Sequence, residues 1–196
     1  MKDIEITLRE DDDEVFAISL VEKPAIQSDW VTLSENTIKL KVIDEEKRII
    51  LGAVLIPDKK IYRKVEDKEF NIFFKDHTIE KISQNWMKRM NSNNVTLEHE
   101  QFITGVTPVE SWIVTDYSKD KASLFNLDVP NGTWVVAMKV DDEDRWKEAK
   151  EGKIKGFSIE GRFLDYYEAS QGKVKASEDE NVLDEIRKVL SIDDSI

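Results

Sequence analysis

The chain offers few side chains for nucleophilic or acid–base catalysis. It has no cysteine and only two histidines, His77 and His99. The lack of cysteine excludes thiol catalysis, disulfides and zinc–thiolate sites, and it favours an intracellular protein. His77 follows Asp76 at the expected start of a helix, where a capping or surface role is typical. His99 is therefore the histidine to consider as a catalytic base.

The serine best suited to act as a nucleophile is Ser158, in the segment Gly156-Phe157-Ser158-Ile159-Glu160-Gly161. Flanking glycines let a backbone approach a substrate closely. A serine between glycines in a strand is more often only a small residue at a bend. The segment alone is therefore weak evidence for catalysis.

The segment Leu97-Glu98-His99-Glu100 raises the alternative of a metal-dependent hydrolase. We expect it at the end of a strand, where Glu98 and Glu100 point to one face and His99 points to the other. This alternation disfavours a metal site, as does the lack of a second suitable histidine nearby in the sequence. We expect neither a metal ion nor another cofactor.

The negative charge is concentrated at the two ends of the chain. The 196 residues carry a formal net charge of −12, to which residues 1–14 and residues 177–196 each contribute −5, leaving −2 for the body. An almost neutral body is not the basic footprint of a nucleic-acid-binding protein, and each acidic end is expected to be a solvated tail. No apolar run approaches the roughly 20 residues that span a bilayer. Neither nucleic acid nor a membrane is an expected partner.

Apolar runs separated by turn signals predict a strand-rich α+β fold. Strands are expected over residues 15–21, 38–43, 48–56, 70–74, 95–100, 102–106, 109–115, 133–140 and 154–164. A helix is expected from Asp76 or Thr78, with an apolar side made of Ile79, Ile82, Trp86 and Met90. A shorter helix is expected from residue 141, ending at Gly152. We expect a small antiparallel barrel with peripheral helices.

Four segments, in one consistent order, resemble the XkdF-like prohead serine proteases of bacteriophages. They are residues 95–100, 109–113, 132–140 and 152–161, within a match from about Ile50 to Phe163. This order is far more specific than a lone serine-centred hexapeptide. These proteins resemble the wider capsid-maturation proteases, which share a barrel fold with the herpesvirus assemblins. The resemblance implies an assemblin-like serine endopeptidase that acts inside the phage procapsid in the host bacterial cytoplasm.

The resemblance implies roles for single residues. His99 matches the family histidine and Ser158 the family serine, so the imidazole would take the hydroxyl proton and return it to the leaving amine. Glu110 matches an acid of the pattern and is the expected third member, with Glu160, on the strand face of Ser158, as the alternative. Arg162 is a candidate for oxyanion support, with a structural salt bridge as the other interpretation.

The resemblance also implies partners. Scaffold and capsid-protein extensions are the expected substrates, self-cleavage is common in the family, and a homodimer is left open. The chain is expected to consist of an acidic segment over residues 1–14, a protease-like domain over 15–167 and an acidic tail over 168–196 with a short helix. We expect the Ser158 hydroxyl within hydrogen-bond reach of a His99 ring nitrogen, or near enough to reach it after a rotamer change, because acyl transfer needs this geometry. The two residues are expected on neighbouring strands at an open surface.

A second likeness points to another class of function. The segment from Ala17 to Ala25 resembles one that other prohead proteases carry after the catalytic serine, where an acid often stands at the position of Ala17. The usual acid is therefore missing from that position. The alternative function is a non-catalytic capsid-interior or scaffolding protein that keeps the protease fold. His99 and Ser158 favour the enzyme, whereas Ala17 favours the alternative.

Overall fold

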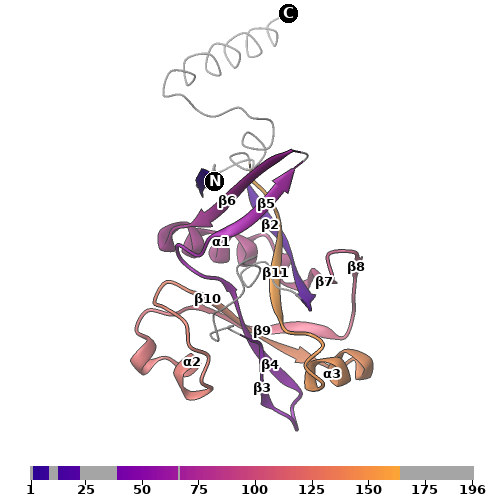
Figure 1. Cartoon of the computed structure of the whole chain (residues 1–196). Helices are drawn as coiled ribbons and strands as arrows, with labels where there is room; N and C mark the ends of the chain where they lie inside the picture. Colours follow the sequence, from indigo (N-terminus) through magenta and orange to yellow (C-terminus); the bar gives the residue numbers. More distant parts are fainter. Residues whose placement is uncertain (1, 9–12, 23–38, 66, 164–196) are drawn as a thin grey trace, which may run out of the picture.

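The computed structural model describes residues 2–8, 13–22, 39–65 and 67–163 (Figure 1). The described strands form three separate sheets with short helices packed around them. The expected strand-rich α+β class with peripheral helices is confirmed. The expected barrel is not, because none of the three sheets closes on itself. The acidic tail over residues 168–196 lies outside the described residues.

The sheet that carries the candidate catalytic residues has the strand order β11-β2-β7-β8. Its strands are β11 (Gly156–Arg162), β2 (Glu14–Val21), β7 (Val95–Leu97) and β8 (Gln101–Phe102). β2 pairs antiparallel with β11 and parallel with β7. This mixed topology brings an early segment of the chain between two late ones.

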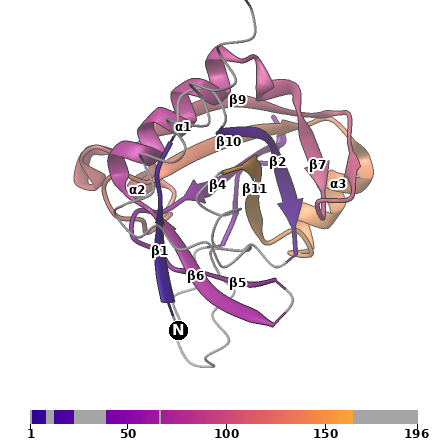
Figure 2. The same cartoon turned by 90° about the horizontal axis from the view of Figure 1, so that it is seen from above.

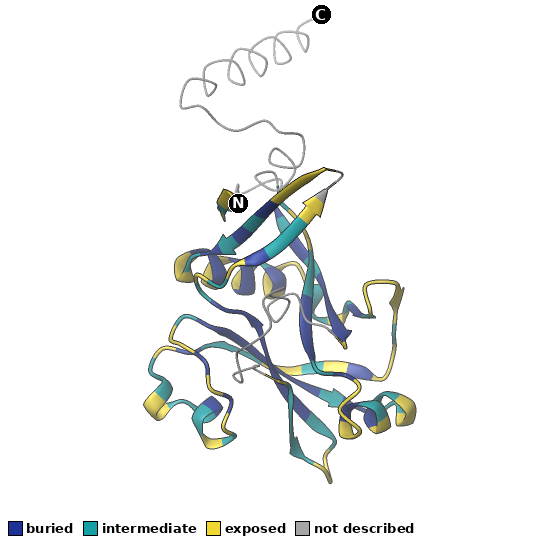
Figure 3. Ribbon diagram, viewed as in Figure 1, coloured by how far each residue is buried: buried dark blue, intermediate teal, exposed yellow. Residues whose placement is uncertain are grey.

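The second sheet is antiparallel throughout, in the order β3-β4-β10-β9. It consists of β3 (Lys41–Asp44), β4 (Ile49–Leu55), β10 (Trp134–Val140) and β9 (Val106–Ile113). β4 and β10 consist almost entirely of buried residues, as do β2 and much of β11 (Figure 3). The apolar runs of these four strands thus form the core between the two sheets.

The packing of β11 on the second sheet depends on a glycine. Gly52 of β4 lies under the ring of Phe157, and a Cβ atom at residue 52 would come within 2.9 Å of that ring. Phe157 is fully buried. This close approach seats β11 against β4 and directs the neighbouring residue, Ser158, to the opposite face of its strand.

The third sheet has the order β1-β6-β5 and contains β1 (Lys2–Ile6), β6 (Lys68–Phe74) and β5 (Ile61–Val65). β1 pairs parallel with β6, and Ile6 is fully buried. Residues 2–6 are therefore part of the fold and differ from the expected solvated tail. The apolar residues Ile4 and Ile6, two positions apart, give this acidic segment a face that packs on the core.

Three helices accompany the sheets: α1 (Asp76–Lys88), α2 (Lys121–Leu124) and α3 (Glu143–Lys150). Two 3₁₀ turns, η2 (Asn91–Asn93) and η3 (Tyr117–Lys119), complete the described elements. α1 runs past β2, β9 and β10 (Figure 2), and its Trp86 packs edge-to-face on Trp134 at 5.3 Å. Met90, expected on its apolar side, follows the end of the helix and is 81% exposed. No helix in the described part of the chain has the length and apolar character to cross a bilayer.

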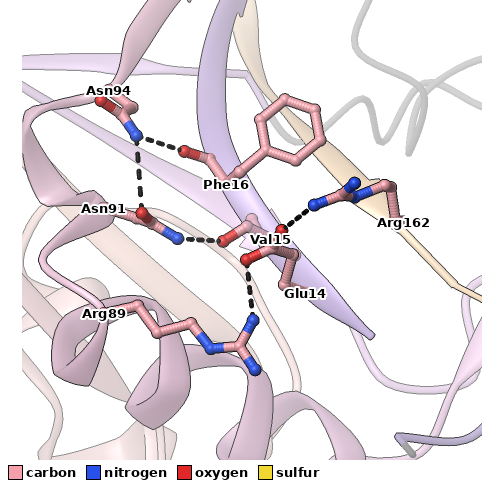
Figure 4. A network of polar contacts seen from close by, with 7 residues as sticks. All are labelled: Glu14, Val15, Phe16, Arg89, Asn91, Asn94 and Arg162. Atoms are coloured by element: carbon pink, nitrogen blue, oxygen red, sulfur yellow. Dashed lines mark hydrogen bonds and ion pairs between the residues drawn. The ribbon is translucent and has the colours of Figure 1, made fainter. Parts of the chain in front are cut away.

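Polar side chains hold the start of β2 in place (Figure 4). Asn91 and Asn94 donate to the carbonyl oxygens of Val15 and Phe16, at 3.0 and 2.9 Å. β7 begins only at residue 95. The two side-chain amides therefore bind the carbonyl groups of β2 that have no partner residue on β7. This arrangement fixes the strand that lies between the two candidate catalytic residues.

Candidate active site

Three hydroxyl side chains form a row across the sheet β11-β2-β7-β8. Ser158 on β11 is directly opposite Ser19 on β2, and Ser19 is directly opposite Thr96 on β7. Directly opposed residues project to the same face of a sheet, so the three hydroxyl groups share one face. All three residues are buried, and Ser158 keeps 5% of its surface exposed. Ser158 therefore does not lie at the open surface that the sequence predicted.

His99 lies in a tight turn, and not in a strand as expected. β7 ends at Leu97, and the Glu100 N–H donates to the Leu97 carbonyl at 3.0 Å. The two central residues of this turn, Glu98 and His99, have φ values of 51° and 61°. Such left-handed turns favour Asn and Gly, and the sequence has neither here, so the residue types alone do not predict the turn. Each such residue costs about 1–3 kcal/mol, a strain typical of functional sites.

Contacts with β2 and the residue after it hold this turn. The Glu98 N–H donates to the Leu20 carbonyl at 3.0 Å, and the Glu98 carboxylate accepts the Glu22 N–H at 2.6 Å. The His99 N–H donates to the Ser19 hydroxyl at 3.0 Å. The backbone of His99 is therefore anchored on the row of hydroxyl groups.

The carboxylate that contacts the His99 ring belongs to Glu160. The distance between His99 Nδ1 and Glu160 Oε1 is 3.3 Å, and the same oxygen accepts a hydrogen bond from the Thr96 hydroxyl. Glu160 is two residues after Ser158, on the same face of β11. The Glu160 side chain is 18% exposed and the His99 side chain 42%. Glu160 contacts the ring through Nδ1, so the other ring nitrogen, Nε2, takes no part in this contact.

Glu110, the expected third member, occupies another part of the molecule. It lies on β9 in the second sheet and forms an ion pair with Lys121 at the start of α2. Lys121 in turn lies over the ring of Trp112, at 4.4 Å from its centroid. The expectation that Glu110 orients His99 is therefore wrong in its geometry. It assumed that β9 neighbours the histidine, but the two segments belong to different sheets.

β2 separates Ser158 from His99. Because neighbouring strands lie about 4.8 Å apart, the backbones of β11 and β7 are roughly 10 Å apart. The hydrogen bonds of the described residues include none between the Ser158 hydroxyl and His99, so the predicted direct contact is not formed. The His99 side chain does extend across β2 to reach Glu160 on the strand of Ser158.

Arg162 is part of a salt bridge. It binds Glu14 Oε1, while Arg89 binds the other carboxylate oxygen at 2.7 Å (Figure 4). A shift in the register after Glu160 brings Arg162 opposite Glu14 on β2. The hydrogen bonds from Arg162 and then Arg89 lower the pKa of the Glu14 carboxyl. The salt-bridge interpretation of Arg162 is confirmed.

A pocket of about 340 Å³ lies beside Ser158. One wall is formed by Ser158, Ile159, Glu160 and Gly161 of β11. The remaining lining residues are mostly apolar and come from the other two sheets, from Phe16 and from Phe163. Ser158 is thus one of the residues that line a cavity large enough for a substrate side chain.

Within the described ranges, no three His, Cys, Asp or Glu side chains gather in a group that could hold a metal ion. The segment Glu98-His99-Glu100 forms the turn described above instead of an alternating strand. Ser19 and Thr96 were not singled out from the sequence. The one signal for Ser19 is that it is the only hydroxyl group in the apolar run from Val15 to Val21.

The sequence matches the family described as "Putative phage serine protease XkdF" over residues 35–167, which is more than half of the chain. The chain therefore belongs to this family of phage serine proteases. The family match covers His99, Ser158 and Glu160, whereas Ser19 lies before it. No curated protein and no solved structure matches the chain significantly.

Proposed function

We propose that the protein is a serine endopeptidase of bacteriophage procapsid maturation, with Ser158 as nucleophile, His99 as base and Glu160 as the carboxylate that orients the base. The observation that carries this proposal is the contact between Glu160 and His99 Nδ1, made from the strand that also carries Ser158. Family membership supports the protease class. The partly buried position of Glu160 and its hydrogen bond from Thr96 support an ordered carboxylate rather than a solvated one.

The chemistry follows from this arrangement. In this mechanism Nδ1 carries the ring proton and faces Glu160 at 3.3 Å, which leaves Nε2 to accept the Ser158 proton. The Ser158 oxygen then bonds to the peptide carbonyl carbon, the imidazolium protonates the leaving amine and the peptide C–N bond breaks. Water attacks the acyl-enzyme in the same way and regenerates the serine. In this proposal substrate binding moves the His99 ring toward Ser158, a motion that its exposed position in a turn permits.

The substrates proposed are the scaffolding protein and the extensions of the major capsid protein, cut inside the procapsid in the host cytoplasm. The relationship with assemblin-like proteases belongs to this proposal as well. It is supported by the resemblance of the segments around His99 and Ser158 to prohead proteases and by the family match.

A non-catalytic capsid-interior or scaffolding protein is the second candidate. Two observations favour it: Ser158 is buried, and β2 separates its strand from the strand that precedes His99. In this case the contact between His99 and Glu160 would serve only to hold the turn on the sheet.

Co-expression with the phage capsid and scaffolding proteins distinguishes the two candidates. We expect cleavage by the parent chain and none by Ser158→Ala, with Ser118→Ala as the matched serine control, since its hydroxyl only donates to Asp116. A fluorophosphonate probe, which labels activated serines, should modify the parent and the control but not Ser158→Ala. Cleavage that survives Ser158→Ala would exclude the proposed nucleophile.

A further inference from the structure

We propose that the pocket beside Ser158 selects a large apolar side chain on the residue whose carbonyl is attacked. This inference rests on the proposed function. It concerns the substrate class, which neither the family match nor the site geometry described above specifies.

The position of the pocket supports this assignment. Its wall on β11 contains four consecutive residues, Ser158 to Gly161. Successive residues of a strand project to opposite faces, so a wall made of consecutive residues follows the edge of β11 and not one face. In the described sheets β11 is an edge strand that pairs with β2 alone. An extended peptide lying along this edge would pass its reacting carbonyl beside Ser158 and direct the side chain of the same residue into the pocket.

The lining of the pocket determines which side chain fits. Eight of the twelve lining residues are apolar: Phe16, Val54, Leu55, Ile61, Ile72, Phe74, Ile159 and Phe163. The charged groups of the lining already have partners, because Glu160 is bound by Thr96 and His99 and the Arg63 guanidinium donates to the Tyr62 carbonyl at 2.8 Å. A charged substrate side chain would lose its hydration against a wall that is mostly apolar, which disfavours its binding.

The volume of the pocket also sets a lower limit on the size of the preferred substrate side chain. Its volume of about 340 Å³ is at the small end of ligand pockets, and it holds a Leu or Phe side chain with room for part of the adjacent main chain. A small residue would leave most of the apolar wall uncovered. Because one methylene in an apolar pocket changes specificity about 10-fold or more, the difference between Phe and Ala should exceed 10-fold.

Peptidyl diphenyl phosphonates test this proposal on the full-length protein. In these probes the serine oxygen bonds to phosphorus, and phenol leaves with the displaced proton. A series that differs only in the side chain next to phosphorus, with Phe, Leu, Ala, Asp and Lys, is compared by the rate of labelling at Ser158. We expect Phe and Leu to react at least about 10-fold faster than Ala, Asp or Lys.

A variant at the pocket wall tests whether the pocket itself determines the side-chain preference. Phe16→Glu introduces a carboxylate at the wall and should shift the Lys-to-Phe rate ratio toward Lys by about 10-fold or more. Phe73→Ala is the matched control, because Phe73 lies on β6 between the lining residues Ile72 and Phe74 and projects to the opposite face. It should leave the ratio unchanged.

The outcomes separate the two proposals. Labelling by the fluorophosphonate together with equal phosphonate rates, or with a preference for Ala, Asp or Lys, would overturn the pocket assignment and leave the protease intact. No labelling of Ser158 by any probe would overturn the proposed function and this inference with it.

Discussion

Glu160 lies directly opposite Ala17 in the register of β11 and β2, and its carboxylate reaches the His99 ring while Ala17 is fully buried. Cβ atoms of directly opposed residues are about 5 Å apart. A carboxylate could therefore reach the same ring from either strand. The acid that the resemblance implies for residue 17 is absent from β2, and the neighbouring strand supplies one across the pair.

We expect that a carboxylate at residue 17 of β2 can partly replace the carboxylate of Glu160 on β11. Glu160→Ala should lower the rate of Ser158 labelling by about 100-fold or more, as loss of a ring-orienting carboxylate does in serine proteases. The double variant Glu160→Ala with Ala17→Glu should recover at least about 10-fold of this loss and shift the pH profile back toward that of the parent. A double variant that folds, by its melting curve, but is no better than Glu160→Ala would contradict the role given to Glu160.

His99→Asn should separate activity from stability. Asparagine adopts positive φ readily, so the relief of strain in the turn offsets the lost contact with Glu160, which is partly exposed and contributes about 1 kcal/mol or less. We expect loss of labelling with a free energy of unfolding within about 1 kcal/mol of the parent, measured by denaturant titration. The control is His77→Asn, since the His77 side chain is 65% exposed on α1 and should keep full activity.

Ser19→Ala should destabilise the turn that carries His99. The substitution removes the acceptor of the His99 N–H, and loss of this partly buried hydrogen bond should cost about 0.5–1.5 kcal/mol. Urea unfolding should show this loss, and hydrogen exchange at His99 should become faster. Unchanged exchange at that amide would argue against Ser19 as its anchor. Ser118→Ala, at an exposed contact, provides the comparison.

Glu14→Gln should reveal a pH-dependent contribution to stability. Arg162 and Arg89 hold the pKa of Glu14 below its ordinary value of 4.5, so the folded state favours the charged carboxylate. Its contribution is fully present above about pH 5 and disappears as the pH falls through the lowered pKa. The variant should be about 1 kcal/mol less stable at pH 7, with the difference shrinking in acid. A difference that is constant from pH 7 to pH 3 would contradict this linkage.

Much of the fold follows from local pattern. The period-two and continuous apolar runs of β2, β4, β10 and β11 identified these strands, and the spacing of Ile79, Ile82 and Trp86 identified α1. Burial of apolar side chains dominates the stability of such segments, so the spacing of their apolar residues predicts strand or helix. The order of strands within the sheets was beyond this information, because it depends on contacts between residues far apart in the chain.

The sequence by itself determined the strand-rich α+β class and, through its resemblance, the pairing of His99 with Ser158 as candidates. Only the tertiary structure decided which carboxylate contacts His99, because it places β2 between β11 and β7 and assigns β9 to another sheet. It also decided that His99 stands in a left-handed turn, a conformation that the residue types of the turn do not favour and that contacts with β2 impose. Long-range pairing, with its direct cross-strand contacts, outweighs local preference at this site.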